Sequence, residues 1–322
     1  MTTMHPRFFS AVTILFTVLL VAGSLSALAN EDVSYLLTAA AKGDLATVNA
    51  LLVSGANANV QDEDGITVLM YAARKNQAEV VATLIDKGAA INAIDAGGWT
   101  ALMFAVKKDN VASVKVLLEK GADAKVRDPS GWSALGLAAA AGFAPIVDLL
   151  IKHGVDVNTQ SDSGSSILMY AAKSGDIATL TTLLDHQANS LTSDKLGITA
   201  LMIAAREGHA PAVDLMIKRG ALLNQKDSSK WTALTWAVKK SKYDAAKALL
   251  AAGADVNNLD AEGTPLLHIA VHNADLNMVT LLLANDAKVK AKDQYGLTAL
   301  VYALKGQQAE IIKRIKDAGG AY

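Results

Sequence analysis

The sequence contains no cysteine among its 322 residues, and this absence removes several kinds of chemistry at once. Disulfide bonds, thiol nucleophiles, zinc sites with thiolate ligands and lipid-attachment cysteines are all excluded. An excess of charge of one sign is lacking as well, because 30 lysines and arginines stand against 31 aspartates and glutamates. No overall charge therefore draws the protein to nucleic acid or to an anionic membrane, and any electrostatic preference must come from local patterns.

Proline is scarce, with five residues, whereas hydrophobic residues make up 52% of the chain, which predicts an ordered, core-forming protein. The start of the chain is different in kind. It carries Arg7, then an uncharged apolar run over residues 8–22, then small residues ending in Ala27-Leu28-Ala29. We interpret residues 1–29 as a secretory signal peptide cleaved after Ala29, with an uncleaved signal anchor as the alternative. The expected location is the periplasm or the exterior, with no membrane span after cleavage.

A period of 33 residues runs through the rest of the chain without an insertion. Glycine recurs at Gly65, Gly98, Gly131, Gly164, Gly197, Gly263 and Gly296, and leucine at Leu69, Leu102, Leu135, Leu168, Leu201, Leu234, Leu267 and Leu300. Alanine recurs at Ala72, Ala105, Ala138, Ala171, Ala204, Ala237, Ala270 and Ala303. Self-similarity at a fixed period of this length is typical of a stacked repeat array.

Each repeat is expected to form a turn containing Asp-x-x-Gly, an alanine-rich first helix, a break and a second helix. The turn glycine suits a positive φ, the threonine or serine after it can cap the first helix, and alanine allows close helix packing. A column of methionines is expected to pack in the core. It consists of Met70, Met103, Met169 and Met202.

The period and two phrases, Asp95-x-x-Gly98-Trp99-Thr100-Ala101-Leu102 and Gly121-Ala122-Asp123, closely resemble ankyrin repeats. The resemblance covers residues 33–322. It implies an all-α solenoid with short β-hairpin turns, made of nine stacked helix-turn-helix units in one domain over residues 30–322. The first repeat is a shortened cap at 33–61, and the second to eighth start near 62, 95, 128, 161, 194, 227 and 260. The ninth is the C-terminal cap at 293–322.

Three repeats depart from this pattern. The fifth has Ser161 at the aspartate position and Gln187 at the position of a capping glycine, with Leu191 in place of the usual asparagine. The seventh has Lys230 at the turn glycine, and in the eighth Thr264-Pro265 is shifted by one residue. These departures are either drift, which repeat arrays tolerate, or marks of a bend or a contact site.

No catalytic motif is present, whether a Gly-x-Gly-x-x-Gly or phosphate loop, His-Glu-x-x-His or Gly-x-Ser-x-Gly, so no enzyme activity and no cofactor are expected. His268 and His272 stand four residues apart, but no third ligand follows at a characteristic spacing, so no metal site is expected. The resemblance implies that His268 and His209 make structural hydrogen bonds instead.

Two columns are the candidate binding residues. Directly after the turn glycine lie three of the four tryptophans, Trp99, Trp132 and Trp231. At the ends of the first helices runs a basic column, reinforced at the next position by Lys108 and Lys240; it contains Arg74, Lys107, Lys173, Arg206 and Lys239. Tryptophans on such a face can anchor an interface, and repeated charges add to a field that attracts an acidic partner. The alternatives are tryptophans that pack on neighbouring turns and a solvated basic helix face.

These observations favour a non-enzymatic adaptor or scaffold in the periplasm. In ankyrin proteins the concave face and the hairpin tips commonly bind a protein partner, which the basic column suggests is acidic here. Two alternatives stay open: a dedicated protective or inhibitory partner of one exported enzyme, and a binder of an acidic cell-envelope polymer. We expect the protein alone to be monomeric, and we expect no nucleic-acid partner.

Overall fold

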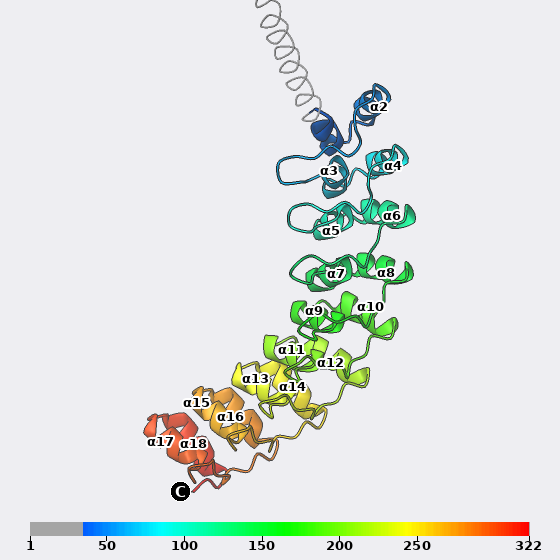
Figure 1. The fold of residues 1–322 in the computed structure, drawn as a ribbon. Helices are drawn as coiled ribbons and strands as arrows, with labels where there is room; N and C mark the ends of the chain where they lie inside the picture. Colours follow the sequence, from blue (N-terminus) through cyan, green and yellow to red (C-terminus); the bar gives the residue numbers. More distant parts are fainter. Residues whose placement is uncertain (1–34, 322) are drawn as a thin grey trace, which may run out of the picture. The chain divides into compact units, whose positions relative to one another are not determined.

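The computed structural model describes residues 35–321, and the predicted signal peptide at residues 1–29 lies outside the described residues. The chain divides after Ser130 into two compact units. In the first unit residues 35–42 are helical. They are followed by α2 (Leu45–Val53), α3 (Val68–Arg74), α4 (Ala78–Asp86), α5 (Ala101–Lys107) and α6 (Val111–Glu119) (Figure 1).

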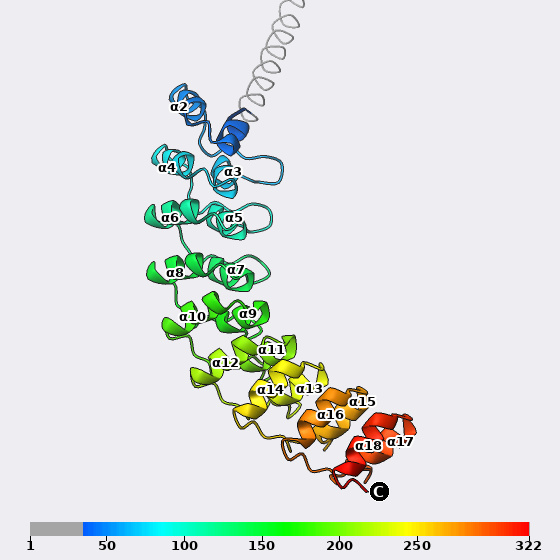
Figure 2. The ribbon, with the colours of Figure 1, turned by 180° about the vertical axis from the view of Figure 1, so that it is seen from behind.

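The second unit continues the alternation of first and second helices from the fourth to the ninth repeat (Figures 1 and 2). Its first helices are α7 (Ala134–Ala141), α9 (Ile167–Ser174), α11 (Ala200–Glu207), α13 (Ala233–Lys239), α15 (Leu266–His272) and α17 (Ala299–Lys305). Its second helices are α8 (Ala144–Lys152), α10 (Ile177–Asp185), α12 (Ala210–Lys218), α14 (Tyr243–Ala251), α16 (Leu276–Leu283) and α18 (Ala309–Asp317).

Within each unit the helices form two layers. In the first unit α3 packs against α5 and α4 against α6. In the second unit the odd-numbered helices pack in sequence from α7 to α17, and the even-numbered helices from α8 to α18. The two layers lie on opposite sides of each unit in both views (Figures 1 and 2). The predicted all-α repeat solenoid is confirmed, and isolated antiparallel bridges such as Gln61 with Thr67 form the expected short hairpin turns.

The core consists of the residue columns that the period revealed. The leucine column is buried in all eight full-phase repeats, and the alanine column is buried beside it, so small side chains bring first helices close together. The methionine column is also buried, as predicted. Three of these methionines have a further role, because each Sδ accepts a hydrogen bond from the backbone N–H of the residue that caps its helix: Met70, Met169 and Met202.

The sixth repeat shows how a regular turn is built. Asp194 Oδ1 accepts hydrogen bonds from the backbone N–H groups of Leu196 and Ile198, both at 2.9 Å. Gly197 has φ 78°, and a Cβ there would lie 3.0 Å from the Cα of Asp227 in the following turn. Thr199 then caps α11 by accepting a hydrogen bond from Met202 N–H. Two separate reasons therefore favour glycine at this position: the positive φ and the close approach of the next repeat.

The irregular repeats keep the backbone conformation of the regular ones, although some of their residues do not favour it. Lys230 and Gln187 take the places of glycines and adopt φ values of 58° and 64°. Left-handed backbone of this kind costs a residue with a Cβ roughly 1 kcal/mol or more. Ser161 replaces the turn aspartate and accepts a hydrogen bond from Ser165 N–H at 3.2 Å. Stacking on both neighbouring repeats holds these turns in a conformation that their own sequence disfavours.

Candidate functional site

The predicted tryptophan and basic columns lie on the turns and first helices of the two units. In the first unit the Trp99 ring is half-buried against Phe104, with ring centroids 5.5 Å apart, and its Nε1 donates a hydrogen bond to Asp128 Oδ2 at 3.1 Å. The Arg74 guanidinium lies over Tyr71, 4.7 Å from the ring centroid. Arg74 also lies 6.0 Å from the centroid of the Phe104 ring, so aromatic rings of α3 and α5 hold Arg74, and Phe104 together with the next turn holds Trp99.

Lys107 and Lys108 at the end of α5 are exposed and make no ion pair with another described residue. The end of α5 is therefore a solvated helix face with unneutralised charge. It offers long-range attraction to an acidic surface, because exposed charges act over about one Debye length of roughly 8 Å at physiological salt.

A groove opens on the second unit beside Trp132, and we call it the Trp132 groove. Its volume is about 510 Å³. The Trp132 and Tyr170 rings pack on each other at a centroid distance of 4.8 Å. Lys173 and Arg206 line the groove together with one carboxylate, Asp194. It therefore brings one predicted tryptophan and two predicted cations together.

Small residues open this groove. Ala140 stands in the basic column, where most other repeats have lysine or arginine, and Ser165 stands in the column that holds tryptophan in three other repeats. Both line the groove with Ser174, and long side chains at these three positions would fill it. Ser165 also belongs to the irregular fifth repeat. The sequence signal for this groove is therefore the presence of small residues in two columns that hold larger side chains in other repeats.

Arg206 is more constrained than Lys173. Its Nε donates to Glu207 Oε1 at 3.1 Å, and its guanidinium carbon lies 5.4 Å from the centroid of the Trp236 ring. Lys173 is exposed and makes no ion pair with another described residue. Glu207, the next residue along the chain, thus pairs directly with Arg206 and holds its guanidinium in place.

Trp231 differs from Trp99 although both occupy the same column. Its ring packs edge-on against Trp236 with a centroid distance of 4.7 Å, and Lys239 Nζ lies 5.1 Å from the centroid of its ring. Its buried Nε1 has no hydrogen-bond partner among the described residues. The residue that corresponds to the acceptor of Trp99 is Asp260, and Trp231 does not reach it. Lys240, next to Lys239, is exposed.

A second groove lies at the eighth and ninth repeats, and we call it the His268 groove. Its volume is about 480 Å³, and three carboxylates line it, those of Asp260, Glu262 and Asp293. Lys239 and His272 line it as well, beside Tyr295 and Tyr302. Sequence reasoning missed this groove, since Asp260 and Asp293 occupy the turn position where aspartate recurs in most repeats.

His268 is 4% exposed, and its Nε2 lies 3.0 Å from the carbonyl oxygen of Leu297. Burial lowers the pKa of this imidazole, so it is neutral at pH 7 and Nε2 is the donor. His209 Nε2 similarly bonds to Lys173 O at 3.1 Å. The structural hydrogen bonds that the resemblance implied for these two histidines are confirmed.

The remaining nitrogen of His268, Nδ1, is buried without a partner among the described residues. The cause is the shift of Thr264-Pro265 by one residue. In the sixth repeat the residue at the cap position offers a hydroxyl and an N–H, whereas Pro265 caps α15 and has neither. A buried acceptor is therefore left without a donor.

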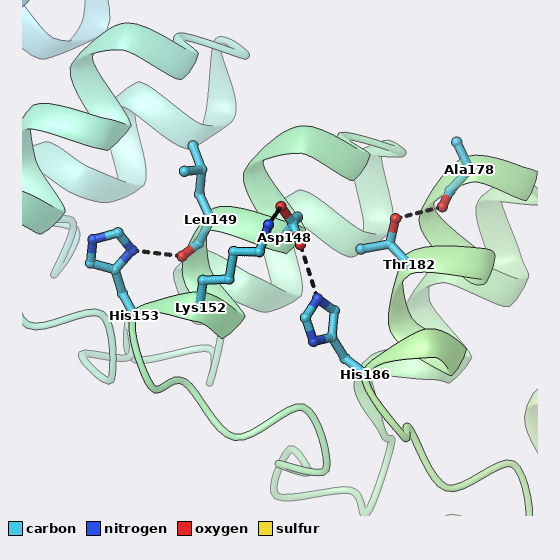
Figure 3. A network of polar contacts seen from close by, with 7 residues as sticks. All are labelled: Asp148, Leu149, Lys152, His153, Ala178, Thr182 and His186. Atoms are coloured by element: carbon cyan, nitrogen blue, oxygen red, sulfur yellow. Dashed lines mark hydrogen bonds and ion pairs between the residues drawn. The ribbon is translucent and has the colours of Figure 1, made fainter.

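The second helices carry a polar network on the opposite layer (Figure 3). Asp148 accepts a hydrogen bond from Lys152 Nζ at 2.7 Å and lies 2.9 Å from His186 Nε2 in the next repeat. The Lys152 hydrogen bond and then the His186 contact lower the pKa of Asp148. Similar cross-repeat pairs join Asp86 to Lys120 and Asp185 to Arg219. These pairs strengthen the contact between neighbouring repeats by modest amounts.

Among residues 35–321 no group of three or more histidines and carboxylates is placed to hold a metal ion. Over the same range, none of the helices is long and apolar enough to cross a membrane.

Comparison with known proteins agrees with this geometry. A family model described as "Ankyrin repeats (3 copies)" matches residues 36–128, 114–194, 187–260 and 253–321. The chain is similar in structure to the crystal structure of the human ASB11 ankyrin repeat domain, with a TM-score of 0.64 and 21% identity over 70% of this chain and 100% of that one. No curated protein matches the chain significantly. Since the family model spans residues 36–321, this chain belongs to the ankyrin-repeat family, whose repeats are generally non-enzymatic protein–protein interaction modules.

Proposed function

We propose that this protein is a periplasmic adaptor or scaffold that binds an acidic protein segment through its turns and first helices. The Trp132 groove carries this proposal. It combines a packed aromatic pair, an exposed lysine and a held guanidinium in one cavity of about 510 Å³. Aromatic and arginine side chains are the residue types that contribute most to binding at protein interfaces.

An acidic side chain with an apolar neighbour fits the groove. Trp132 and Tyr170 supply apolar area, and Ile198 and Ile203 extend it. Lys173 and the terminal nitrogens of Arg206 are donors that no described residue uses, so a carboxylate can take them. In the first unit the exposed Lys107 and Lys108 would speed the encounter with an acidic partner.

Site-specific crosslinking tests the proposal. A photoreactive residue is placed at Lys173 in the groove or, as the matched control, at Lys218, an exposed lysine at the end of a second helix. We expect a crosslinked protein from position 173 and none from position 218. Purified, this partner should bind the mature chain with an affinity that Trp132→Ala with Lys173→Glu lowers at least tenfold, while circular dichroism is unchanged. Equal capture from both positions, or equal binding by the variant, would contradict the proposed face.

The proposed location has its own test, because it rests on the predicted signal peptide and not on the groove. Fractionation should recover the protein in the exported fraction, and its mature N-terminus should be Asn30. A full-length chain beginning at Met1 in the cytosol would remove the periplasmic part of the proposal and leave the groove assignment intact.

A further inference from the structure

The two grooves of the second unit differ in charge. The Trp132 groove has two cations and one carboxylate in its lining, whereas the His268 groove has three carboxylates and one lysine. The lysine, Lys239, directs its Nζ over the Trp231 ring. The basic column alone predicted an acidic partner along the whole face, but the eighth and ninth repeats oppose that expectation locally.

The hydrogen bonds of the three carboxylates show which oxygens hold the turns and which have no donor. Both oxygens of Asp293 are used, because Oδ1 accepts from the N–H groups of Tyr295 and Leu297 and Oδ2 accepts from the Tyr302 hydroxyl. Only one oxygen of Asp260 is used: its Oδ1 accepts from Glu262 N–H and Thr264 N–H. Its Oδ2 and both oxygens of Glu262 accept nothing from the described residues.

The availability of Asp260 Oδ2 follows from the neighbouring repeat. Trp99 donates its Nε1 to the aspartate of the next turn, but Trp231 packs on Trp236 and leaves the equivalent Asp260 without that donor. The buried His268 ring, which lines the same groove, adds Nδ1 as a further acceptor without a donor. Apart from Lys239, whose Nζ lies over the Trp231 ring, the charged side chains of this groove with unused oxygens are therefore Asp260 and Glu262.

We infer that the His268 groove binds an arginine side chain of the protein partner. A guanidinium is a planar cation with five donors and no acceptor, which matches a pair of carboxylates with unused oxygens. It pairs with the carboxylates of Asp260 and Glu262. Tyr295, which is 72% exposed, offers a ring on which the planar group can stack.

This inference rests on the proposed function for the identity of the ligand as a protein, but the site itself is defined by its own chemistry. Within the second unit the partner segment would have an acidic residue for the Trp132 groove and an arginine for the His268 groove. Such a segment can bind in only one direction, because reversing it brings like charges together in both grooves.

A small probe tests the site without the partner. N-acetyl-L-arginine amide, which has a cation and no carboxylate, is titrated into the mature chain and followed by amide chemical shifts. Its matched control is N-acetyl-L-citrulline amide, which keeps the shape and loses the charge. We expect saturable shifts at residues 260–302 with the arginine probe and at least tenfold weaker binding of the citrulline probe. Equal binding of both probes, or shifts spread over all turns, would overturn the inference.

Substitutions of the two carboxylates test whether they bind the arginine probe. Glu262→Gln removes one charge from a side chain without a structural contact, and Asp260→Asn keeps the Oδ1 acceptor that holds the turn. The double variant should bind the arginine probe about tenfold more weakly. Asp62→Asn with Asp64→Asn makes the same charge change at the same turn positions in the second repeat and should leave binding unchanged. If Glu262→Gln alone and the double variant both bind normally, the groove is not an arginine site.

The result is separable from that for the Trp132 groove. Loss of the crosslink at position 173 would remove the proposed acidic contact but would not alter binding of the arginine probe. Conversely, a captured partner whose affinity is unchanged by Glu262→Gln and by the double variant would contradict this inference and leave the proposed function standing.

Discussion

The first helices of the sixth and eighth repeats, α11 and α15, begin at the same repeat position but have different capping residues. In the sixth, Thr199 and Met202 exchange two hydrogen bonds across the helix start. In the eighth, Pro265 occupies the cap, no side chain caps α15, and His268 Nδ1 is left without a partner among the described residues. Both helices nevertheless form and bury the same leucine and alanine columns.

This comparison teaches that stacking, rather than local capping, holds the repeat in shape. A cap contributes about 1 kcal/mol, whereas each buried leucine contributes roughly 1.5–3 kcal/mol through removal of apolar area from water. A repeat can therefore lose its cap and keep its fold, provided that its neighbours are present. The cost is a polar group without a partner, and in the eighth repeat that group lies beside an acidic groove.

The largest expected effect comes from a turn glycine that the next repeat covers. Gly197→Ala places a Cβ 3.0 Å from the Cα of Asp227, while Gly263→Ala has a nearly equal φ of 77° and no atom within 4 Å. We expect losses in the free energy of unfolding of about 2–3 kcal/mol and about 1 kcal/mol. Urea unfolding followed by circular dichroism measures both. Equal losses would show that contact between turns adds nothing to backbone strain.

Restoring the missing cap should make the eighth repeat resemble the sixth. Pro265→Thr supplies a hydroxyl and an N–H at the helix start, and we expect it to raise the free energy of unfolding by about 1 kcal/mol. Thr199→Ala is the reverse control and should cost about the same. If part of the gain comes from His268 Nδ1, the gain will shrink in a His268→Leu background, which a double-mutant cycle measures. An undiminished gain would assign it all to the cap.

Lys230→Gly sharpens the comparison in the seventh repeat, where the turn glycine is missing. Lys230 has φ 58°, so glycine relieves backbone strain, and we expect a gain of about 0.5–1 kcal/mol in unfolding free energy. Lys195→Gly is the control, because that exposed turn lysine does not have a positive φ; it should stabilise nothing. A loss at position 230 would show that the lysine makes compensating contacts.

The smallest effect is expected on the other layer, where Asp148 contacts Lys152 and His186. Hydrogen bonds lower the pKa of Asp148, so its contribution is present above the unfolded-state pKa and is lost as pH falls through the folded-state value. Asp148→Asn should therefore lower the midpoint of urea unfolding slightly at pH 6–7, and this difference should shrink as the pH falls through the folded-state pKa of Asp148. Asp214→Asn, at the same repeat position without such contacts, should be neutral. A constant difference at every pH would exclude the ionic origin.

Much of the fold was predictable from sequence because each repeat makes the same local and neighbouring contacts. The methionine column was predicted as core and is buried, and the leucine and alanine columns that define the period are buried with it. The candidate site was predictable only in part. The columns of Trp132, Lys173 and Arg206 were evident, but the groove they line depends on small residues in two different repeats. The half-buried state of Trp99 and the pairing of Arg206 with Glu207 depend on which of several neighbouring side chains each residue contacts. An alignment of the repeats does not show which of these contacts forms.

The 33-residue period by itself determined the helix pairs, the buried columns and the membership of the family, because a repeated apolar pattern can be buried only by stacking like on like. The tertiary structure decided which polar groups remain unused. Trp99 reaches the next aspartate and Trp231 does not, and Pro265 leaves His268 without a donor. Hydrogen bonds depend on distances of a few tenths of an ångström and on direction, so they follow from the final packing rather than from the pattern that produced it.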